Sequence, residues 1–216
     1  PEAKLKLEPS MKPEAIEALS FQIIEEEAGE HGFPDEQWRI VRRMIHTSAD
    51  FDYMKTVRFH PEAVNKGLEA IQAGTEVFTD TTMALAGINT RTLAAVGCST
   101  SCLISDPGVA AAAATKGSTR ASAAVDAVLE RINGCVYVIG NAPTALLRLL
   151  EVIREQDVSP ALVIGFPVGF VNAAESKDEL MRSRVPFISN HGRKGGSNIA
   201  ASVVNALLKM LPGPVS

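Results

Sequence analysis

The chain has 216 residues, a length at which one α/β domain with a sizeable core is common. Its net charge of −4 and pI of about 5.6 argue against a nucleic-acid-binding surface, and no apolar run approaches the roughly 18 residues of a membrane span. Because the first residues lack a hydrophobic signal core, we expect a cytoplasmic protein. Cys98, Cys102 and Cys135 suggest neither a disulfide framework nor a zinc site, and are interpreted as buried thiols.

Helical spacing of apolar residues predicts two helices near the N-terminus. Residues 1–11 are polar and are predicted to form an arm ahead of a single domain that spans 12–216. The first helix opens at Pro13 and ends near His31, and the second follows over 35–50.

After residue 55, short apolar runs alternate with helical stretches. The predicted strands span 56–60, 75–80, 93–97, 135–140, 161–166 and 186–190. The predicted helices span 61–73, 80–87, 118–133, 143–156, 173–183 and 196–211, and the alanine-rich stretch 109–118 is either helical or a flap. Short apolar runs that end in Gly, Asn or Ser are typical of strands buried on both faces of a parallel sheet. The pattern therefore predicts a three-layer α/β/α fold with a mostly parallel central sheet.

Polar segments follow the predicted strands, at the sheet edge where ligands bind in such folds. They are TDTTMALAGI, GCSTSCLISDPG, IGNAPTAL, GFPVGFVNAAESK and SNHGRKGGSN. In the last segment, Arg193 and Lys194 precede a helix, which favours an anion such as a carboxylate. The segment lacks P-loop spacing, so nucleotide binding is a weaker interpretation, and a solvated loop is the alternative without function.

His46 stands out among the four histidines because two cations precede it by one helical turn. Arg42 and Arg43 would disfavour its protonation until an anionic ligand neutralised them. That arrangement suits a proton donor that becomes competent when substrate binds. From spacing alone, however, a surface histidine on a charged helix face remains the simpler interpretation. His191 lies in the loop that contains Arg193 and Lys194 and could contact a ligand. His60 precedes Pro61 and is interpreted as structural.

The run RRMIHTSADFDY (42–53) resembles the hallmark segment of the precorrin-8X methylmutase family. Further segments agree in the same order, and the resemblance covers nearly the whole chain: IEALSFQIIEEE, DTTMALAGI, CLISD, IGNAPTAL, GFPVGFVNAAESK and GRKGGS. The resemblance implies an isomerase of cobalamin biosynthesis that converts precorrin-8X to hydrogenobyrinic acid by moving one methyl group between adjacent macrocycle carbons. It implies no metal, nucleotide or redox cofactor, and a homodimer with active sites near the subunit interface.

The resemblance also implies roles for single residues. The family's catalytic histidine falls on His46, a hydroxyl residue in its first helix on Ser20, and a basic residue on Arg43, the latter two contacting substrate. Because the substrate carries many carboxylates, Arg193 and Lys194 join the candidate substrate-binding residues. One histidine can protonate the macrocycle, and the rest of catalysis would be positioning.

Other functions stay open at this point. A homologous enzyme of cobalt-first pathways acts on the cobalt-containing substrate. A non-catalytic corrinoid carrier would use the same basic loops without an acid, and a nucleotide-dependent enzyme would use HGRKGGSN.

Overall fold

A six-stranded sheet forms the centre of the computed structural model, which describes residues 12–211. Its strand order is β1-β6-β5-β4-β2-β3. The strands are β1 (Val57–Phe59), β2 (Glu76–Thr79), β3 (Ser99–Ser101), β4 (Val136–Ile139), β5 (Leu162–Gly165) and β6 (Phe187–Asn190). All neighbouring pairs from β3 to β6 are parallel, whereas β1 pairs with β6 antiparallel. The predicted mostly parallel sheet is confirmed.

Helices connect the strands and precede the sheet. They are α1 (Pro13–Ala28), α2 (Asp35–Ser48), α3 (Tyr53–Thr56), α4 (Ala63–Gln72), α5 (Thr82–Gly87), α6 (Thr90–Ala95), α7 (Pro107–Lys116), α8 (Arg120–Asp126), a 3-10 turn η1 (Leu129–Arg131), α9 (Pro143–Gln156), α10 (Ala173–Arg182) and α11 (Ser197–Met210). None of those within 12–211 is both long and apolar enough to cross a bilayer. The cytoplasmic location stays a prediction.

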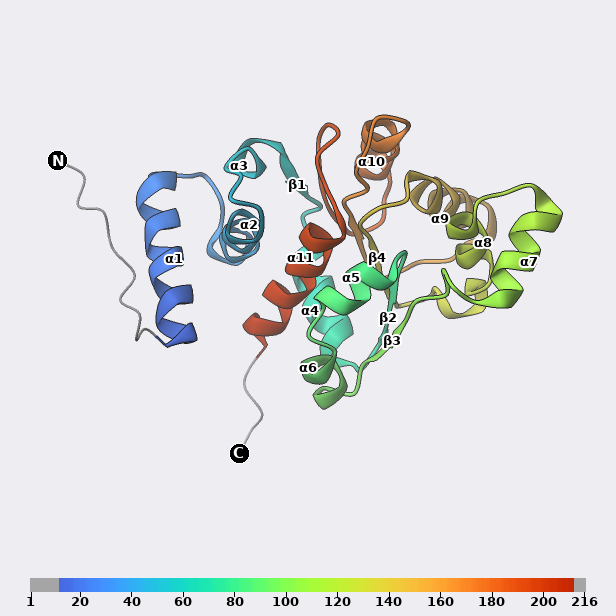
Figure 1. Cartoon of the computed structure of the whole chain (residues 1–216), viewed down its shortest axis with the longest axis horizontal. Coiled ribbons are helices and arrows are strands. Elements are labelled where there is room, and N and C mark those ends of the chain that lie inside the picture. Colours follow the sequence, from blue (N-terminus) through green and yellow to red (C-terminus); the bar gives the residue numbers. More distant parts are fainter. Residues whose placement is uncertain (1–11, 212–216) are drawn as a thin grey trace.

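Two hydrophobic cores lie on opposite faces of the sheet, so the three-layer prediction is also confirmed. Alternate strand residues face each core because strand side chains alternate in direction. Val136 and Val138 pack with α2, α4 and α11, whereas Tyr137 and Ile139 pack with α8, α9 and α10. Figure 1 shows α1 outside α2 at one end of the molecule and α7 outside α8 at the other.

Three predictions about single segments need correction or refinement. Residues 93–97, predicted as a strand, contain the end of α6, and the strand lies at 99–101 instead. The helix predicted over 118–133 is broken into α8 and η1, which buries Val128 and Ile132. The alanine-rich stretch 109–118 is helical as far as Lys116, where α7 ends, and Asp106 caps this helix by accepting from the Val109 N–H at 3.0 Å.

Other expectations concern the first helix, the thiols and the N-terminal arm. Helix α1 ends at Ala28, before His31, which stacks on Trp38 with 3.9 Å between ring centroids. Cys98 and Cys135 are buried as expected, and Cys102 is half-buried. The predicted arm over 1–11 lies outside the described residues.

Candidate active site

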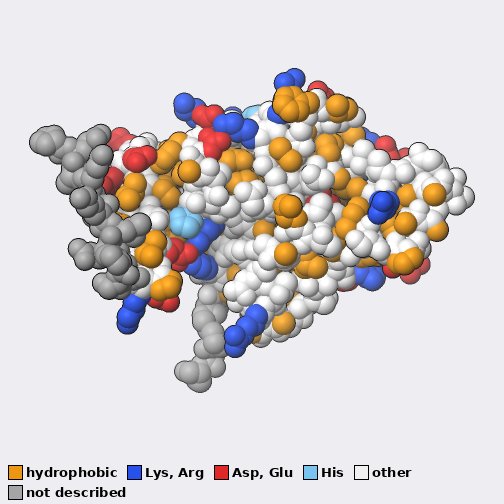
Figure 2. Space-filling model, in the orientation of Figure 1, with side chains coloured by type: hydrophobic (Ala, Val, Ile, Leu, Met, Phe, Trp, Pro, Cys, Tyr) orange, Lys and Arg blue, Asp and Glu red, His pale blue; other side chains and the backbone are white. Residues whose placement is uncertain are grey.

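Helix α2 presents its charged face to α1 and α11 because its apolar stripe is fixed in the core. Positions three and four apart share a helix face, so the buried set and the polar set separate. The buried set is Trp38, Ile40, Val41, Met44 and Ile45. The opposite face carries Arg42, Arg43 and His46, and Figure 2 shows charged side chains gathered where α1 and α2 approach α11.

His46 lies half-buried in the last turn of α2, against the Phe21 ring of α1, with 5.1 Å between ring centroids. Burial lowers the pKa of His46 below its ordinary value, and the nearby Arg43 charge lowers it further, while Glu17 acts in the opposite direction. The imidazole is therefore neutral at pH 7 in the unliganded protein. The sequence predicts an effect of both Arg42 and Arg43 on His46. Of the two, Arg43 lowers the pKa of His46, and burial is the larger cause.

Arg43 is held by an ion pair that the sequence did not indicate. Its NH1 donates to Glu17 Oε1 at 2.6 Å, and Lys209 Nζ at the end of α11 donates to Glu17 Oε2 at 2.9 Å. The two cations lower the pKa of Glu17 to about 2. A guanidinium has five N–H donors, so Arg43 keeps donors for a second carboxylate. Arg42 instead pairs with Glu25.

Two clefts flank this part of α2. The first has a volume of about 350 Å³ and brings together Ser20, His46 and Phe51 between α1 and α2. The second, about 390 Å³, runs along α11 and contains Arg43 and Thr47. Its other walls come from α5, α6 and α11, with polar groups from Asn89, Thr92, Asn198, Ser202 and Asn205. Ser20 and His46 therefore share a cleft, and Arg43 lines the neighbouring one.

Arg193 and Lys194 line neither of these two clefts. Lys194 Nζ donates to Asp50 Oδ2 at 2.6 Å and Asp52 Oδ2 at 2.7 Å, just beyond the end of α2. These carboxylates raise the pKa of Lys194. The Arg193 guanidinium lies 5.4 Å from the ring centroid of Phe170, which is 84% exposed.

The loops at the carboxyl edge of the sheet are joined through Asp80, which is only 3% exposed. Its Oδ1 accepts the Gly140 N–H at 3.0 Å, and its Oδ2 accepts those of Asn141 and Ala142 at 2.8 and 2.7 Å. Thr81 Oγ1 lies 2.8 Å from Ser197 Oγ at the start of α11. These bonds hold the β2–α5 and β4–α9 loops against α11.

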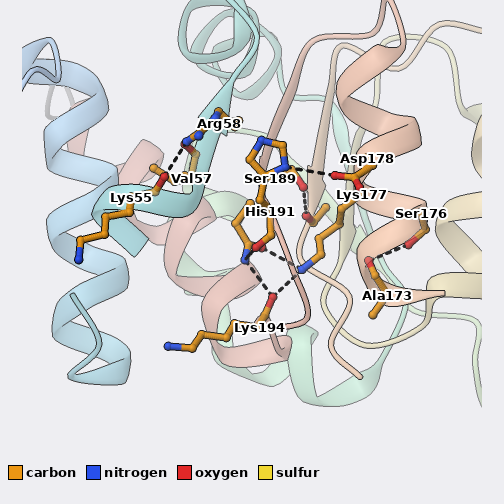
Figure 3. A network of polar contacts seen from close by, with 12 residues as sticks. Lys55, Val57, Arg58, Ala173, Ser176, Lys177, Asp178, Ser189, His191 and Lys194 are labelled. Carbon is orange, nitrogen blue, oxygen red and sulfur yellow. Dashed lines mark hydrogen bonds and ion pairs between the residues drawn. The ribbon is translucent and has the colours of Figure 1, made fainter. Parts of the chain in front are cut away.

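A second polar centre surrounds Lys177 of α10, whose side chain is completely buried (Figure 3). Its Nζ donates to Asn190 Oδ1 at 3.2 Å and to the Lys194 carbonyl oxygen at 2.6 Å. Burial lowers the pKa of Lys177 to about 8. Relative to an unperturbed lysine at 10.5, this shift corresponds to about 3 kcal/mol of destabilisation that is fully present below pH 8.

Sequence reasoning missed several residues of this region. Glu17 precedes Ser20 by three residues and Phe21 by four on α1, and this helical spacing is a signal that could have been used. Lys209 and Asn198 gave no such signal, because α11 reaches α2 only through the tertiary fold.

The chain matches a family model described as precorrin-8X methylmutase over residues 15–210. It is 48% identical over 204 residues to a cobalt-precorrin-8 methylmutase from Salmonella typhimurium, covering 91% of this chain and 95% of that protein. It is 40% identical over 197 residues to a precorrin-8X methylmutase from Sinorhizobium, covering 90% and 93%. A solved structure of precorrin-8X methyl mutase from Thermus thermophilus superimposes with a TM-score of 0.85 at 45% identity, covering 91% and 95%. The chain belongs to the precorrin-8X methylmutase family.

Proposed function

We propose that this protein is a precorrin-8X methylmutase, an isomerase of cobalamin biosynthesis that moves one methyl group between adjacent carbons of the corrin macrocycle. The observation that carries the proposal is the place of His46. It lies on the wall of a cleft at the end of α2, in a chain that matches the family over 15–210.

His46 acts as the proton donor in this proposal. The methyl shift is an intramolecular rearrangement, so the protein must set the tautomer of the conjugated system and hold the ring. An imidazolium N–H supplies a proton to the macrocycle, and the neutral ring takes it back afterwards. Carboxylates of the bound substrate raise the pKa of His46 by offsetting the Arg43 charge. Protonation of His46 is thereby coupled to substrate binding.

Substrate binding is assigned to Ser20 and Arg43 beside His46, and to Arg193 and Lys194 farther along the carboxyl edge. A macrocycle with carboxylates around its rim is a ligand that extends beyond one cleft. Separated cations therefore fit it better than a single anion pocket would. Lys194 reaches Asp50 and Asp52 in the described structure, so a substrate carboxylate would have to compete for its ammonium.

The decisive experiment mixes the purified protein with metal-free precorrin-8X, and separately with cobalt-precorrin-8, and follows the visible spectrum. Conversion of the metal-free ring assigns the reaction to hydrogenobyrinic acid formation. Conversion of the cobalt ring alone assigns the protein to the cobalt-first pathway. Binding of either ring without conversion would identify a corrinoid carrier and contradict the methylmutase proposal.

The Arg43→Gln variant is expected to bind the corrinoid product about 10- to 100-fold more weakly, because a charge-assisted hydrogen bond contributes about 1.5–3 kcal/mol. Visible-absorbance titration measures the affinity. Arg42→Gln is the matched control, since Arg42 lies on the same helix but pairs with Glu25. Equal affinities of Arg43→Gln and the parent protein would remove Arg43 from the substrate site.

A homodimer is expected in solution. Each of the two clefts beside α2 is open and has a volume below 400 Å³, which is small for a whole macrocycle. We therefore expect a second copy of the chain to complete the binding site. Light scattering at micromolar concentration should give twice the mass of the 23.0 kDa chain. A mass near 23.0 kDa would contradict this expectation.

A further inference from the structure

We propose that Lys177 is a positioning residue for substrate binding, which sets the conformation of the loop over 190–196 and thereby the places of Arg193 and Lys194. The inference rests on the proposed function, because the loop matters only if those two cations meet the substrate. Lys177 itself does not line either cleft beside α2.

The contacts of Lys177 all lead into this loop. Its ammonium bonds the first residue of the loop through Asn190 Oδ1 and a later one through the Lys194 carbonyl. Asn190, also fully buried, donates from Nδ2 to the His191 carbonyl at 3.1 Å and to the Lys194 carbonyl at 3.0 Å. The two side chains therefore bind the loop from inside, and Figure 3 shows Lys177 approaching the Lys194 backbone.

The remainder of the loop is fitted closely to its neighbours. A Cβ on Gly195 would lie 2.2 Å from the Phe166 carbonyl oxygen, and the Gly196 N–H donates to that oxygen at 2.9 Å. On the other side, Lys194 Nζ reaches Asp50 and Asp52 beyond α2. The Lys194 backbone is thus held by α10 while its side chain is held by the segment that follows His46. A shift of this backbone would move both cations.

A structural requirement alone does not account for a lysine here. Within residues 12–211 the ammonium of Lys177 forms no ion pair within 4.0 Å. The charge of the neighbouring Asp178 favours the protonated form, but burial acts more strongly in the opposite direction. An apolar side chain of similar length would fill the same space without that penalty. What it could not do is donate simultaneously to Asn190 and Lys194. We therefore infer that the lysine is present to fix the conformation of the loop over 190–196.

The test replaces Lys177 with Met, which keeps the length and removes the donors, and uses Lys66→Met on the exposed face of α4 as the matched control. Three quantities are measured: corrinoid product affinity by titration, KM and kcat by visible spectroscopy, and amide hydrogen exchange in peptides that cover 190–196. For Lys177→Met we expect a roughly tenfold weaker Kd and higher KM, since two charge-assisted contacts are misplaced. We expect kcat within about twofold of the parent, because His46 is untouched, and faster exchange confined to the loop.

A double-mutant cycle separates positioning from general loosening. Asn190→Ala removes the other half of the polar centre, and the double variant should bind no more weakly than the weaker single variant, because both side chains act on the same carbonyl. The proposal would be contradicted if the increases in Kd of the two single variants multiplied in the double variant. It would also be contradicted if Lys177→Met had the Kd and the loop exchange rates of the parent protein. If Lys177→Met does not fold, Asn190→Ala alone must show the same Kd increase and loop exchange. If the parent protein binds no corrinoid, the proposed function fails, while the exchange data still report whether Lys177 sets the loop.

Discussion

The His46→Asn variant is expected to bind the macrocycle with parental affinity and to lose about 10²–10⁴-fold in turnover. Asparagine keeps a hydrogen-bond donor on α2 but cannot supply a proton near neutral pH. The side chain contacts Phe21 and the cleft rather than the core, so the fold should persist. Single-turnover absorbance changes measure the rate, and circular dichroism checks the fold. His60→Asn, a histidine at the edge of the sheet, is the matched control.

The pH dependence of the same enzyme provides an independent readout. The proton donor is active when protonated, so rates should fall as pH rises through the pKa of His46. In the free protein this pKa is lowered below 6.5 by burial and by Arg43, so kcat/KM should fall with a midpoint below 6.5. Bound carboxylates raise the pKa, so the midpoint for kcat should lie at higher pH. A parental turnover rate in His46→Asn would assign the proton to another group, and coinciding midpoints would contradict the proposed effect of the substrate carboxylates on the pKa of His46.

The Asp80→Ala variant is expected to lose about 1–3 kcal/mol of unfolding free energy, mainly through the buried Gly140 N–H. Three backbone N–H groups donate to this buried carboxylate, and each buried donor left without a partner costs about 1–3 kcal/mol. Urea unfolding followed by Trp38 fluorescence measures the change. The loss is expected without any direct effect on the proton chemistry, because Asp80 does not line either cleft beside α2.

Asp80→Asn is the informative comparison. An amide has only one acceptor oxygen. In one orientation this oxygen accepts the N–H groups of Asn141 and Ala142, and in the other it accepts the N–H of Gly140. In either orientation the amide NH₂ group faces an N–H that is left without an acceptor. Its stability should fall between those of the parent and Asp80→Ala. If both variants unfold like the parent, the carboxylate is not what holds the 140–142 turn.

The layered architecture was predictable because buried parallel strands have a strong local signal. The runs around Val136–Ile139 and Leu162–Gly165 are apolar throughout and end in glycine. The strand predicted over 93–97 was wrong because a short apolar segment is equally compatible with the buried end of a helix. There, Asn89 caps the helix by accepting the Thr92 N–H, which favours α6, while the true edge strand Ser99–Ser101 is polar.

The candidate site was predictable only where its residues are close in sequence. Arg43 and His46 lie one turn apart on α2, and the resemblance added Ser20. The ion pair between Glu17 and Lys209 joins residues 192 positions apart, so no local pattern contains it. Arg193 and Lys194 were selected for their charge, but their directions depend on Phe170, Asp50 and Asp52, which only the folded chain brings to them.

The two outer strands of the sheet have a consequence for self-association. An outer strand exposes unpaired N–H and C=O groups that invite another chain to extend the sheet. Here β1 and β3 are three residues each, and the Arg58 guanidinium of β1 donates to the carbonyls of Lys55 and Val57 at 2.9 and 2.7 Å (Figure 3). At the opposite border, the polar strand β3 is bound to its inner neighbour β2, where the Ser101 hydroxyl donates to the Glu76 side chain. Short outer strands, one of which has carbonyl groups already occupied by Arg58, disfavour edge-to-edge pairing of sheets between monomers, so assembly of this protein should proceed through helices and loops.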